Sequence, residues 1–327
     1  MNIIPFSARP AALLLLSSLL AAATPGWSQA WPAKPVRLVL SQPPASSPDI
    51  VARLLGERLT KLWGHSVVVE NKPGGQNVIG AQRAATAAPD GYTYYYATTA
   101  ALVINAYTFK SLPYDPQKDF APVGMIAHSP FVIAVNADLA AKNLKELIAH
   151  ARANPGKLSM ATEGSRTFSG LMGDMFAKTA GLNMVNVPYA GVSPGILDTI
   201  AGRTHLIVQS SAALSAHYKS LRPIEVTSAR RVPGLDDIPA LNETFPGFQY
   251  VGWHAVVTPK NTPTPIIQRV NKDLDNVQKE PEIARRLIEL GLVSEGAGTP
   301  AQFGEFLRAE HVRWSRLAKD VGVVADY

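Results

Sequence analysis

The stretch from Val36 to Leu62, VRLVLSQPPASSPDIVARLLGERLTKL, predicts a strand, a short loop and an amphipathic helix. Its first residues, Val36 to Leu40, have the apolar and β-branched character of a buried strand. Apolar residues then recur every three or four positions from Ile50 to Leu62, which places them on one face of a helix. We expect Ser47 to cap this helix and Pro48 to begin it, where an N–H would have no intrahelical partner in any case.

The loop of this unit, from Ser41 to Asp49, is a predicted anion site. A helix N-terminus at the carboxyl end of a strand presents unpaired N–H groups and a partial positive charge. The loop adds hydroxyl groups, which suit a carboxylate. We interpret Asp49 as a support for the helix dipole rather than a ligand contact, because its carboxylate would repel an acidic ligand. A ligand role for Asp49 would return if the ligand carried an ammonium group.

Residues 1–30 predict a secretory signal peptide. Arg9 precedes an apolar run from Ala11 to Ala23, and Ser28-Gln29-Ala30 resembles a cleavage site between small residues. The apolar run is too short to span a bilayer. A buried N-terminal helix is the alternative, and we expect export to the periplasm.

The composition excludes several classes of protein. The residues after Ala30 suffice for two domains of ordinary size. The chain has no cysteine, which excludes disulfides, thiolate metal sites and thiol nucleophiles. The formal net charge falls from +6 to +5 once Arg9 is removed, and the basic residues are scattered rather than arranged in a stripe. We therefore expect no nucleic-acid partner, whereas the modest positive charge favours anionic small molecules.

The alternation of strands and helices continues along the chain and predicts two α/β domains. Together with the unit from Val36 to Leu62, the strands and helices up to Ala97 predict a doubly wound parallel sheet. Two strands then follow each other without a helix between them, which indicates a crossing to a second domain near residues 127–130. A long strand at residues 249–257 and a purely helical tail indicate a return near residues 250–253. The predicted domains comprise residues 31–127 with 252–327, and residues 128–251.

This plan is typical of periplasmic solute-binding proteins. Ordered motifs occur along the chain: Trp31-Pro32-x-Lys34-Pro35-Val36, Asp49-Ile50-Val51-Ala52-Arg53-Leu54, Val67-Val68-Val69-Glu70-Asn71-Lys72-Pro73-Gly74, Ala88-Pro89-Asp90-Gly91-Tyr92-Thr93, Leu112-Pro113-Tyr114-Asp115, Lys118-Asp119-Phe120-Ala121-Pro122 and Val187-Pro188-Tyr189-Ala190-Gly191. They closely resemble the Bug (tripartite tricarboxylate transporter) substrate-receptor family. The resemblance implies an α/β fold, the two-domain type II periplasmic binding protein or Venus flytrap with two interdomain crossovers. It also implies a receptor that binds a small organic acid and delivers it to a two-component membrane permease, and no cofactor is needed.

Carried over position by position, the resemblance implies a ligand site built from loops of both domains. The family commonly has glycines in the first loop, whereas this chain has Ala45, Ser46 and Ser47 there. Without these glycines the backbone cannot approach a ligand as closely. We therefore expect either that the hydroxyls of Ser46 or Ser47 contact the ligand in place of the backbone, or that the pocket favours a different ligand. Gln209 and His254 stand where the family commonly has an aspartate and an apolar or aromatic residue. The predicted ligand-binding residues are Ser41, Gln42, Ala45, Ser46, Ser47, Asp49, Thr98, Thr99, Thr162, Gly164, Ser165, Thr167, Tyr189, Gln209 and His254.

Several alternatives stay open. Arg166 either pairs with a second carboxylate or faces solvent at the rim of the cleft. His254, beside Trp253, is interpreted as a packing residue rather than a pH switch. The seven histidines form no His-Glu-x-x-His motif and no clustered metal spacing, so we predict no metal site and no catalytic residue. We expect a monomer that is not an enzyme. The alternatives to a transport receptor are a receptor that presents its ligand to a sensor protein, and a periplasmic hydrolase.

Overall fold

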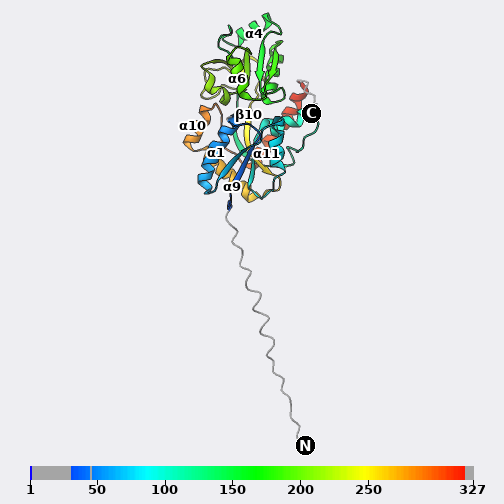
Figure 1. Cartoon of the computed structure of the whole chain (residues 1–327), viewed down its shortest axis with the longest axis vertical. Coiled ribbons are helices and arrows are strands. Elements are labelled where there is room, and N and C mark those ends of the chain that lie inside the picture. The colour runs from blue at the N-terminus through cyan, green and yellow to red at the C-terminus, as the bar shows by residue number, and fades with distance from the viewer. Residues whose placement is uncertain (2–30, 45, 321–327) are drawn as a thin grey trace.

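The computed structural model describes Met1 and residues 31–44 and 46–320. The predicted signal peptide beyond Met1, and also Ala45, therefore lie outside the described residues. Two five-stranded sheets with flanking helices form an α/β molecule of two domains, which confirms the predicted fold class. Figure 1 shows one domain with α1 (Ser47–Trp63) and α9 (Thr264–Gln278), and the other with α4 (Leu144–Ala153) and α6 (Val192–Ile200).

The first sheet contains β1 (Val36–Leu40), β2 (Val67–Asn71), β3 (Thr93–Thr98), β4 (Phe120–Ser129) and β10 (Gly252–Pro259). Its strand order is β2-β1-β3-β10-β4. β1 pairs in parallel with β2 and β3, whereas β10 runs antiparallel to β3 and β4. The prediction of a wholly parallel sheet is therefore wrong, because β10 returns from the second sheet and enters the first in the opposite direction.

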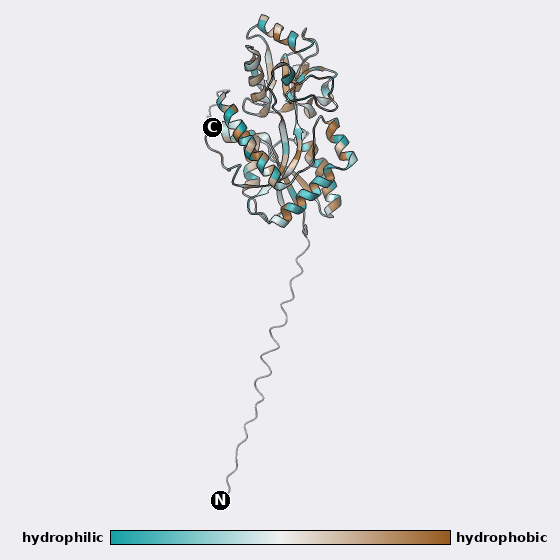
Figure 2. Ribbon diagram, turned by 180° about the vertical axis from the view of Figure 1, so that it is seen from behind, coloured by the Kyte–Doolittle hydropathy of each residue, from teal (hydrophilic) through white to brown (hydrophobic). Residues whose placement is uncertain are grey.

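Helices cover both faces of the first sheet. The helical tail packs here, since α9 and α11 contact β4 while α10 contacts α1. The helices carry hydrophobic and hydrophilic residues along their length, as expected for helices with one face on a sheet (Figure 2). Besides α1 and α9, the elements are η1 (Gly75–Asn77), α2 (Val78–Ala85), the π-helical turn η2 (Ala100–Ile104), α3 (Asn105–Thr108), α10 (Pro281–Glu289) and α11 (Pro300–Asp320).

Helix α1 begins one residue earlier than the sequence predicts. Ser46, not Ser47, occupies the position before the helix, and Pro48 is the second helical residue. The Ser46 hydroxyl donates to the Pro43 carbonyl at 2.7 Å, so it does not cap a backbone N–H of the helix. Gly64 ends the helix with a φ of 68°, a left-handed conformation that glycine adopts without steric penalty.

The second sheet contains β5 (Phe131–Asn136), β6 (Ser159–Thr162), β7 (Val185–Pro188), β8 (Leu206–Ser210) and β9 (Leu221–Val226). Its strand order is β7-β6-β8-β5-β9, with β6 parallel to β7 and β8 and β5 antiparallel to β8 and β9. This sheet is mixed for the same reason as the first, because β5 enters from the other domain. The remaining elements here are α5 (Phe168–Ala180), α7 (Ser211–Leu214), η3 (Ser215–His217) and α8 (Leu241–Thr244).

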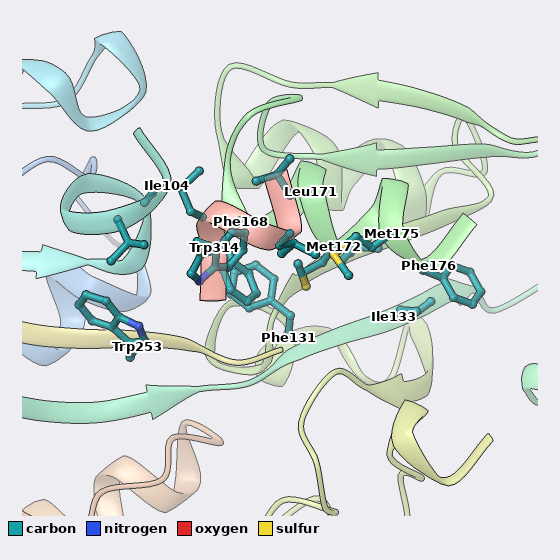
Figure 3. Close-up of a cluster of buried hydrophobic side chains, with 14 of the residues drawn as sticks. Ile104, Phe131, Ile133, Phe168, Leu171, Met172, Met175, Phe176, Trp253 and Trp314 are labelled. Atoms are coloured by element: carbon teal, nitrogen blue, oxygen red, sulfur yellow. The ribbon is translucent and has the colours of Figure 1, made fainter. Parts of the chain in front are cut away.

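The chain passes between the sheets twice, and the two sheets share an apolar cluster. Pro130 alone separates β4 from β5, and residues 227–251 lead from β9 back to β10. Phe131 and Phe168 of the second domain belong to the same buried cluster as Trp253 on β10 and Trp314 on α11 (Figure 3). The core is therefore continuous from one sheet to the other.

Glu225 on the edge strand β9 carries a stability prediction. Its side chain is 3% exposed, and its Oε2 has no hydrogen-bond partner. Burial, reinforced by Glu243 and opposed by Arg231, raises the pKa of this carboxyl from 4.5 to about 7. A raised pKa stabilises the folded state below pH 4.5, and this contribution is lost as the pH rises through about 7.

We therefore expect Glu225→Gln to raise the free energy of unfolding by about 1 to 2 kcal/mol at pH 9, after allowance for screening at the sheet edge, and by much less at pH 5. Denaturant unfolding of both proteins at the two pH values measures the difference. An effect of equal size at pH 5 and pH 9 would show that the carboxyl titrates normally in the folded protein.

Candidate functional site

A cleft between the two sheets brings together residues from both domains. Its volume is about 90 Å³, whereas one ordered water needs roughly 10 to 15 Å³, so the cleft suits a small molecule rather than a polymer. The strands of the first sheet and the loops and helices beside them line it with Gln42, Ser46, Ser47, Pro48, Asn77, Thr98, Thr99, Ala100, Ser129, Gly252, Trp253 and His254. The second domain lines it with Phe131, Glu163, Thr167, Phe168, Ser169, Val192, Gln209, Ser210 and Ala213.

Many of the predicted site residues meet at this cleft. They come from the β1–α1 loop, the end of β3, the N-terminus of α5, the end of β8 and the start of β10, which are far apart in the sequence. The predicted residues that line the cleft are Gln42, Ser46, Ser47, Thr98, Thr99, Thr167, Gln209 and His254.

Two predicted residues of the first loop do not line the cleft. The Ser41 hydroxyl donates to the Asn77 carbonyl at 2.9 Å and lies 2.6 Å from the Tyr95 hydroxyl, so it holds η1 against the sheet. The Asp49 carboxylate accepts from Asn71 at 2.8 Å and from Arg53 at 3.1 Å. Asp49 thus joins the first turn of α1 to the end of β2, in agreement with its interpretation as a supporting residue.

Four predicted residues of the second domain do not line the cleft: Thr162, Gly164, Ser165 and Tyr189. The Thr162 hydroxyl donates to Asn186 at 2.7 Å, and the Tyr189 hydroxyl donates to Asp198 at 2.8 Å. Gly164 adopts a φ of 120° in the turn, and Ser165 is exposed at its outside.

Arg166 was predicted either to pair with a ligand carboxylate or to face solvent, and the structure shows a different contact. Its guanidinium donates to the backbone carbonyl of Thr108 at 3.1 Å, and Thr108 belongs to α3 of the other domain. Arg166 does not line the cleft. It therefore links the two domains beside the cleft, and a sequence-local argument could not have shown this because Thr108 is 58 positions away.

Several helices of the described chain begin at the cleft, and α1 and α5, one from each domain, are the longest of them. The first residues of α1, Ser47 and Pro48, and the residues Thr167 to Ser169 at the start of α5 all line it. The helices have 17 and 13 residues, long enough for each to present a substantial partial positive charge at its N-terminus. Because the described lining contains no lysine or arginine, these helix ends supply its positive potential.

Unpartnered polar atoms gather at the same cleft. Ser47 Oγ, Ser129 Oγ and Gln42 Oε1 are buried and have no hydrogen-bond partner among the residues that the structure describes. All three residues line the cleft. Buried polar groups are nearly always hydrogen-bonded, so a concentration of such atoms marks this cleft as a place where a polar molecule binds.

Glu163 is a cleft residue that the sequence analysis missed. It lies immediately after β6 and accepts a long hydrogen bond of 3.4 Å from Gln209. Burial raises the pKa of its carboxyl from 4.5 to about 7, and the Gln209 contact opposes this shift. The available signal was its position at the carboxyl end of a parallel strand, where ligand loops lie. Asn77, Ser129 and Ser169 were also missed, because they approach the cleft only through the folded chain.

His254 lies in the wall of the cleft and stays neutral. It is 4% exposed, and its Nδ1 lies 3.1 Å from the hydroxyl of Tyr96. Burial lowers the pKa of the imidazole from 6.5 to about 3. A pH switch in the physiological range is therefore excluded for this histidine, which agrees with its interpretation as a packing residue.

A serine motif that the sequence analysis overlooked does not form a hydrolase site. Gly191-Val192-Ser193-Pro194-Gly195 has the Gly-x-Ser-x-Gly spacing of a nucleophile elbow. Such an elbow holds its serine on a strained turn next to a histidine base. Ser193 instead lies in the first turn of α6, is exposed, and makes no hydrogen bond to a histidine in the described structure.

The described part of the chain contains neither a metal-ligand cluster nor a membrane-spanning helix. Among residues 31–44 and 46–320, no group of three acidic or histidine side chains is arranged to hold a metal ion. No helix of this part of the chain is long and apolar enough to cross a membrane.

The fold and the cleft define the class of protein. Two mixed α/β sheets with two crossovers and a polar cleft between them are the architecture of a type II periplasmic binding protein. The chain matches the tripartite tricarboxylate transporter family receptor model over residues 51–323 and belongs to that family. The family is one of solute-binding receptors rather than enzymes.

Relatives along nearly the whole length agree with this assignment. A UPF0065 protein of Bordetella bronchiseptica is 34% identical over 314 residues, which cover 95% of this chain and 93% of that protein. The structure of R. palustris Rpa4515 with adipate has a TM-score of 0.85 and 30% identity, covering 89% of this chain and 98% of that one. The periplasmic binding protein BugD has a TM-score of 0.83 and 29% identity, covering 90% and 99%.

Proposed function

We propose that this chain is a periplasmic receptor that captures a small organic acid between its two domains and delivers it to a tripartite tricarboxylate-type membrane permease. The main support is the meeting of two helix N-termini, those of α1 and α5, at one cleft whose described lining has no lysine or arginine. Helix N-termini and unpartnered hydroxyls are well suited to a carboxylate. The adipate in the Rpa4515 structure supports the same class of ligand.

Capture proceeds by closure of one domain on the other. The ligand carboxylate meets the first turn of α1 and the Ser47 hydroxyl, and the start of α5 then closes on the ligand. A ligand that contacts both domains stabilises the closed state by the contacts it makes only there. The closing bodies are residues 31–127 with 252–327, and residues 128–251, in a monomer exported by the signal peptide at residues 1–30.

Ligand capture of this kind requires no reactive side chain, so the proposal includes no catalytic residue and no cofactor. A receptor that presents its ligand to a sensor protein would use the same cleft. Uptake of a bound, labelled acid into cells with and without the receptor distinguishes the two outputs. Receptor-dependent uptake supports delivery to a permease, whereas a transcriptional response without uptake supports a sensor.

The hydroxyl of Ser47 provides a direct test of the site. An acid at a hundred times its Kd stabilises the receptor by about 2.7 kcal/mol, which is readily seen as a thermal shift. We expect Ser47→Ala to raise the Kd for that acid about tenfold, because a hydrogen bond to a charged group is lost. The melting temperature of the ligand-free variant should hardly change, since this hydroxyl has no partner in the described part of the chain.

Ser215→Ala is the matched control. The Ser215 hydroxyl donates to the Ala212 carbonyl at 3.0 Å and does not line the cleft, so this variant should keep the original Kd. Calorimetric titration of the three proteins with adipate and with other small carboxylates gives the values. An unchanged Kd in Ser47→Ala would place the acid outside this cleft.

A further inference from the structure

We infer that the ligand of this cleft is amphoteric, carrying an N–H-bearing cationic group as well as its carboxylate, and that Glu163 receives the cationic group. This inference rests on the proposed function and narrows it to one class of small acid. It concerns the part of the ligand other than the carboxylate.

The charges of the cleft favour a ligand without net charge. Glu163 is the one acidic or basic side chain in the described lining apart from the neutral His254. The N-termini of α1 and α5 each contribute roughly half a positive charge, enough together to balance one carboxylate, and the shorter helix α6 adds a further partial charge at Val192. A second carboxylate would find no lysine or arginine in this lining and would lie in a cleft with Glu163. An ammonium or similar cation would instead find a carboxylate partner.

Two hydrogen-bond acceptors of the cleft point to the same preference, because they are short of donors among the described residues. The amide nitrogen of Gln42 donates to Asn77 Oδ1 at 2.7 Å and to Thr98 Oγ1 at 3.3 Å. Its Oε1 is thereby directed away from these partners and is buried without one. The Glu163 carboxylate accepts one hydrogen bond from the described residues, from Gln209 at 3.4 Å. An ammonium group offers three donors and no acceptor, so it complements these oxygens.

Glu163 is held in position for this role. Its backbone N–H donates to the Ser169 hydroxyl at 3.2 Å, and that hydroxyl donates to the Val208 carbonyl on β8. The side chain of Gln209 is itself held, since its Oε1 accepts from the Ser210 N–H at 2.7 Å. The carboxylate therefore needs little reorganisation to receive a ligand.

The protonation of Glu163 separates this inference from its main competitor. The raised pKa of about 7 means that the carboxyl loses its proton near neutral pH. Its neighbours Ser169 on α5 and Gln209 on β8 are uncharged, Arg166 donates to the Thr108 carbonyl, and the pKa of His254, lowered to about 3, keeps that side chain neutral. A cationic group binds the ionised form, so its affinity rises with pH until Glu163 is ionised. A dicarboxylate held by the protonated form would show the opposite dependence.

Matched acids test the inference on the purified protein. The amino acids are alanine, leucine, phenylalanine, 4-aminobutanoate and 6-aminohexanoate, each compared by calorimetry with its desamino acid and with a dicarboxylate of the same length. We expect at least one amino acid to bind at least tenfold more tightly than both of its analogues. Its affinity should fall about tenfold from pH 8 to pH 6.

Glu163→Gln should weaken binding of that amino acid by about tenfold or more and remove the dependence on pH, because the negative charge is lost. Glu225→Gln is the control, because its carboxyl also has a raised pKa of about 7 but does not line the cleft, and it should leave the affinity unchanged. Tighter binding of a dicarboxylate, strengthening at pH 6, would overturn the inference and leave the proposed receptor intact. If Glu163→Gln bound the amino acid with unchanged affinity, the inference would likewise be overturned and the proposed receptor left intact. If no acid bound to the protein, both the inference and the proposed function would be overturned.

Discussion

Replacing Trp314 with alanine is expected to lower the free energy of unfolding by about 3 to 5 kcal/mol, the range for removing a buried tryptophan from a core. Trp314 lies on α11 and is 3% exposed. Its ring packs edge-on against Phe168 with the centroids 5.7 Å apart, and Phe168 in turn packs on Phe131 at 4.6 Å (Figure 3). The substitution therefore leaves a cavity where the C-terminal helix meets the second domain.

The same substitution should also weaken ligand binding. Phe168 is the first residue of α5 and lines the cleft, so the ring that Trp314 supports belongs to the helix N-terminus that faces the ligand. Loss of this support leaves the start of α5 less well fixed, and we expect the Kd of the bound acid to rise several-fold. Denaturant unfolding and calorimetric titration measure the two effects separately.

Val312→Ala is the matched control on the same helix. Val312 is 56% exposed, so its truncation should change the free energy of unfolding by less than about 0.5 kcal/mol and leave the Kd unaltered. If Trp314→Ala cost no more than Val312→Ala, the contact between α11 and the second domain would contribute little to stability.

Replacing Gly170 with alanine is expected to destabilise the protein by about 2 to 4 kcal/mol and to raise the Kd of the bound acid at least about tenfold. A Cβ at this position would overlap the carbonyl oxygen of Gly164 and lie 2.6 Å from that of Ser165. Both atoms are backbone atoms, so no side-chain rotation relieves the overlap. The turn must move, and it is the turn that carries Glu163 and Thr167 into the cleft.

Gly304→Ala on α11 is the control for helix propensity. Its Cβ would meet Pro122 at an ordinary 3.5 Å, so alanine should stabilise the helix by roughly 0.5 to 1 kcal/mol. The two substitutions are identical in chemistry and both lie in helices, yet we expect opposite signs. Thermal unfolding of both variants with and without the acid measures their stability and their binding. A Gly170→Ala protein more stable than the original would show that the turn at residues 164–167 can move at little energetic cost.

Local sequence patterns predicted most of the secondary structure and eight of the 21 residues that line the cleft. The β1–α1 unit, the Thr98-Thr99 loop and the start of α5 lie where strand and helix signals placed them, because the carboxyl ends of parallel strands gather at one edge of a sheet. The direction of β10 could not be predicted in this way. It depends on which domain the chain comes from, and no residue of the strand itself encodes that.

The roles of individual loop residues also depended on the fold. Ser41 and Ser47 are both serines of one loop, yet Ser41 bonds to Tyr95 and η1 while the Ser47 hydroxyl has no partner and lines the cleft. The difference arises because α1 begins at Ser47, which turns the backbone between the two residues. Similarly, Asp49 and Glu163 are both acids beside predicted ligand loops, and only Glu163 lines the cleft.

By itself the sequence determined the class of the protein: its motifs and its alternation of strands and helices are local features, and they indicate a two-domain receptor with anion-binding loops. Tertiary structure alone decided which groups face the ligand. Charge balance in a cleft is a property of side chains that lie far apart in the chain, such as Glu163 and His254. Burial disfavours the charged form of each, so it raises the pKa of the acid and lowers that of the histidine.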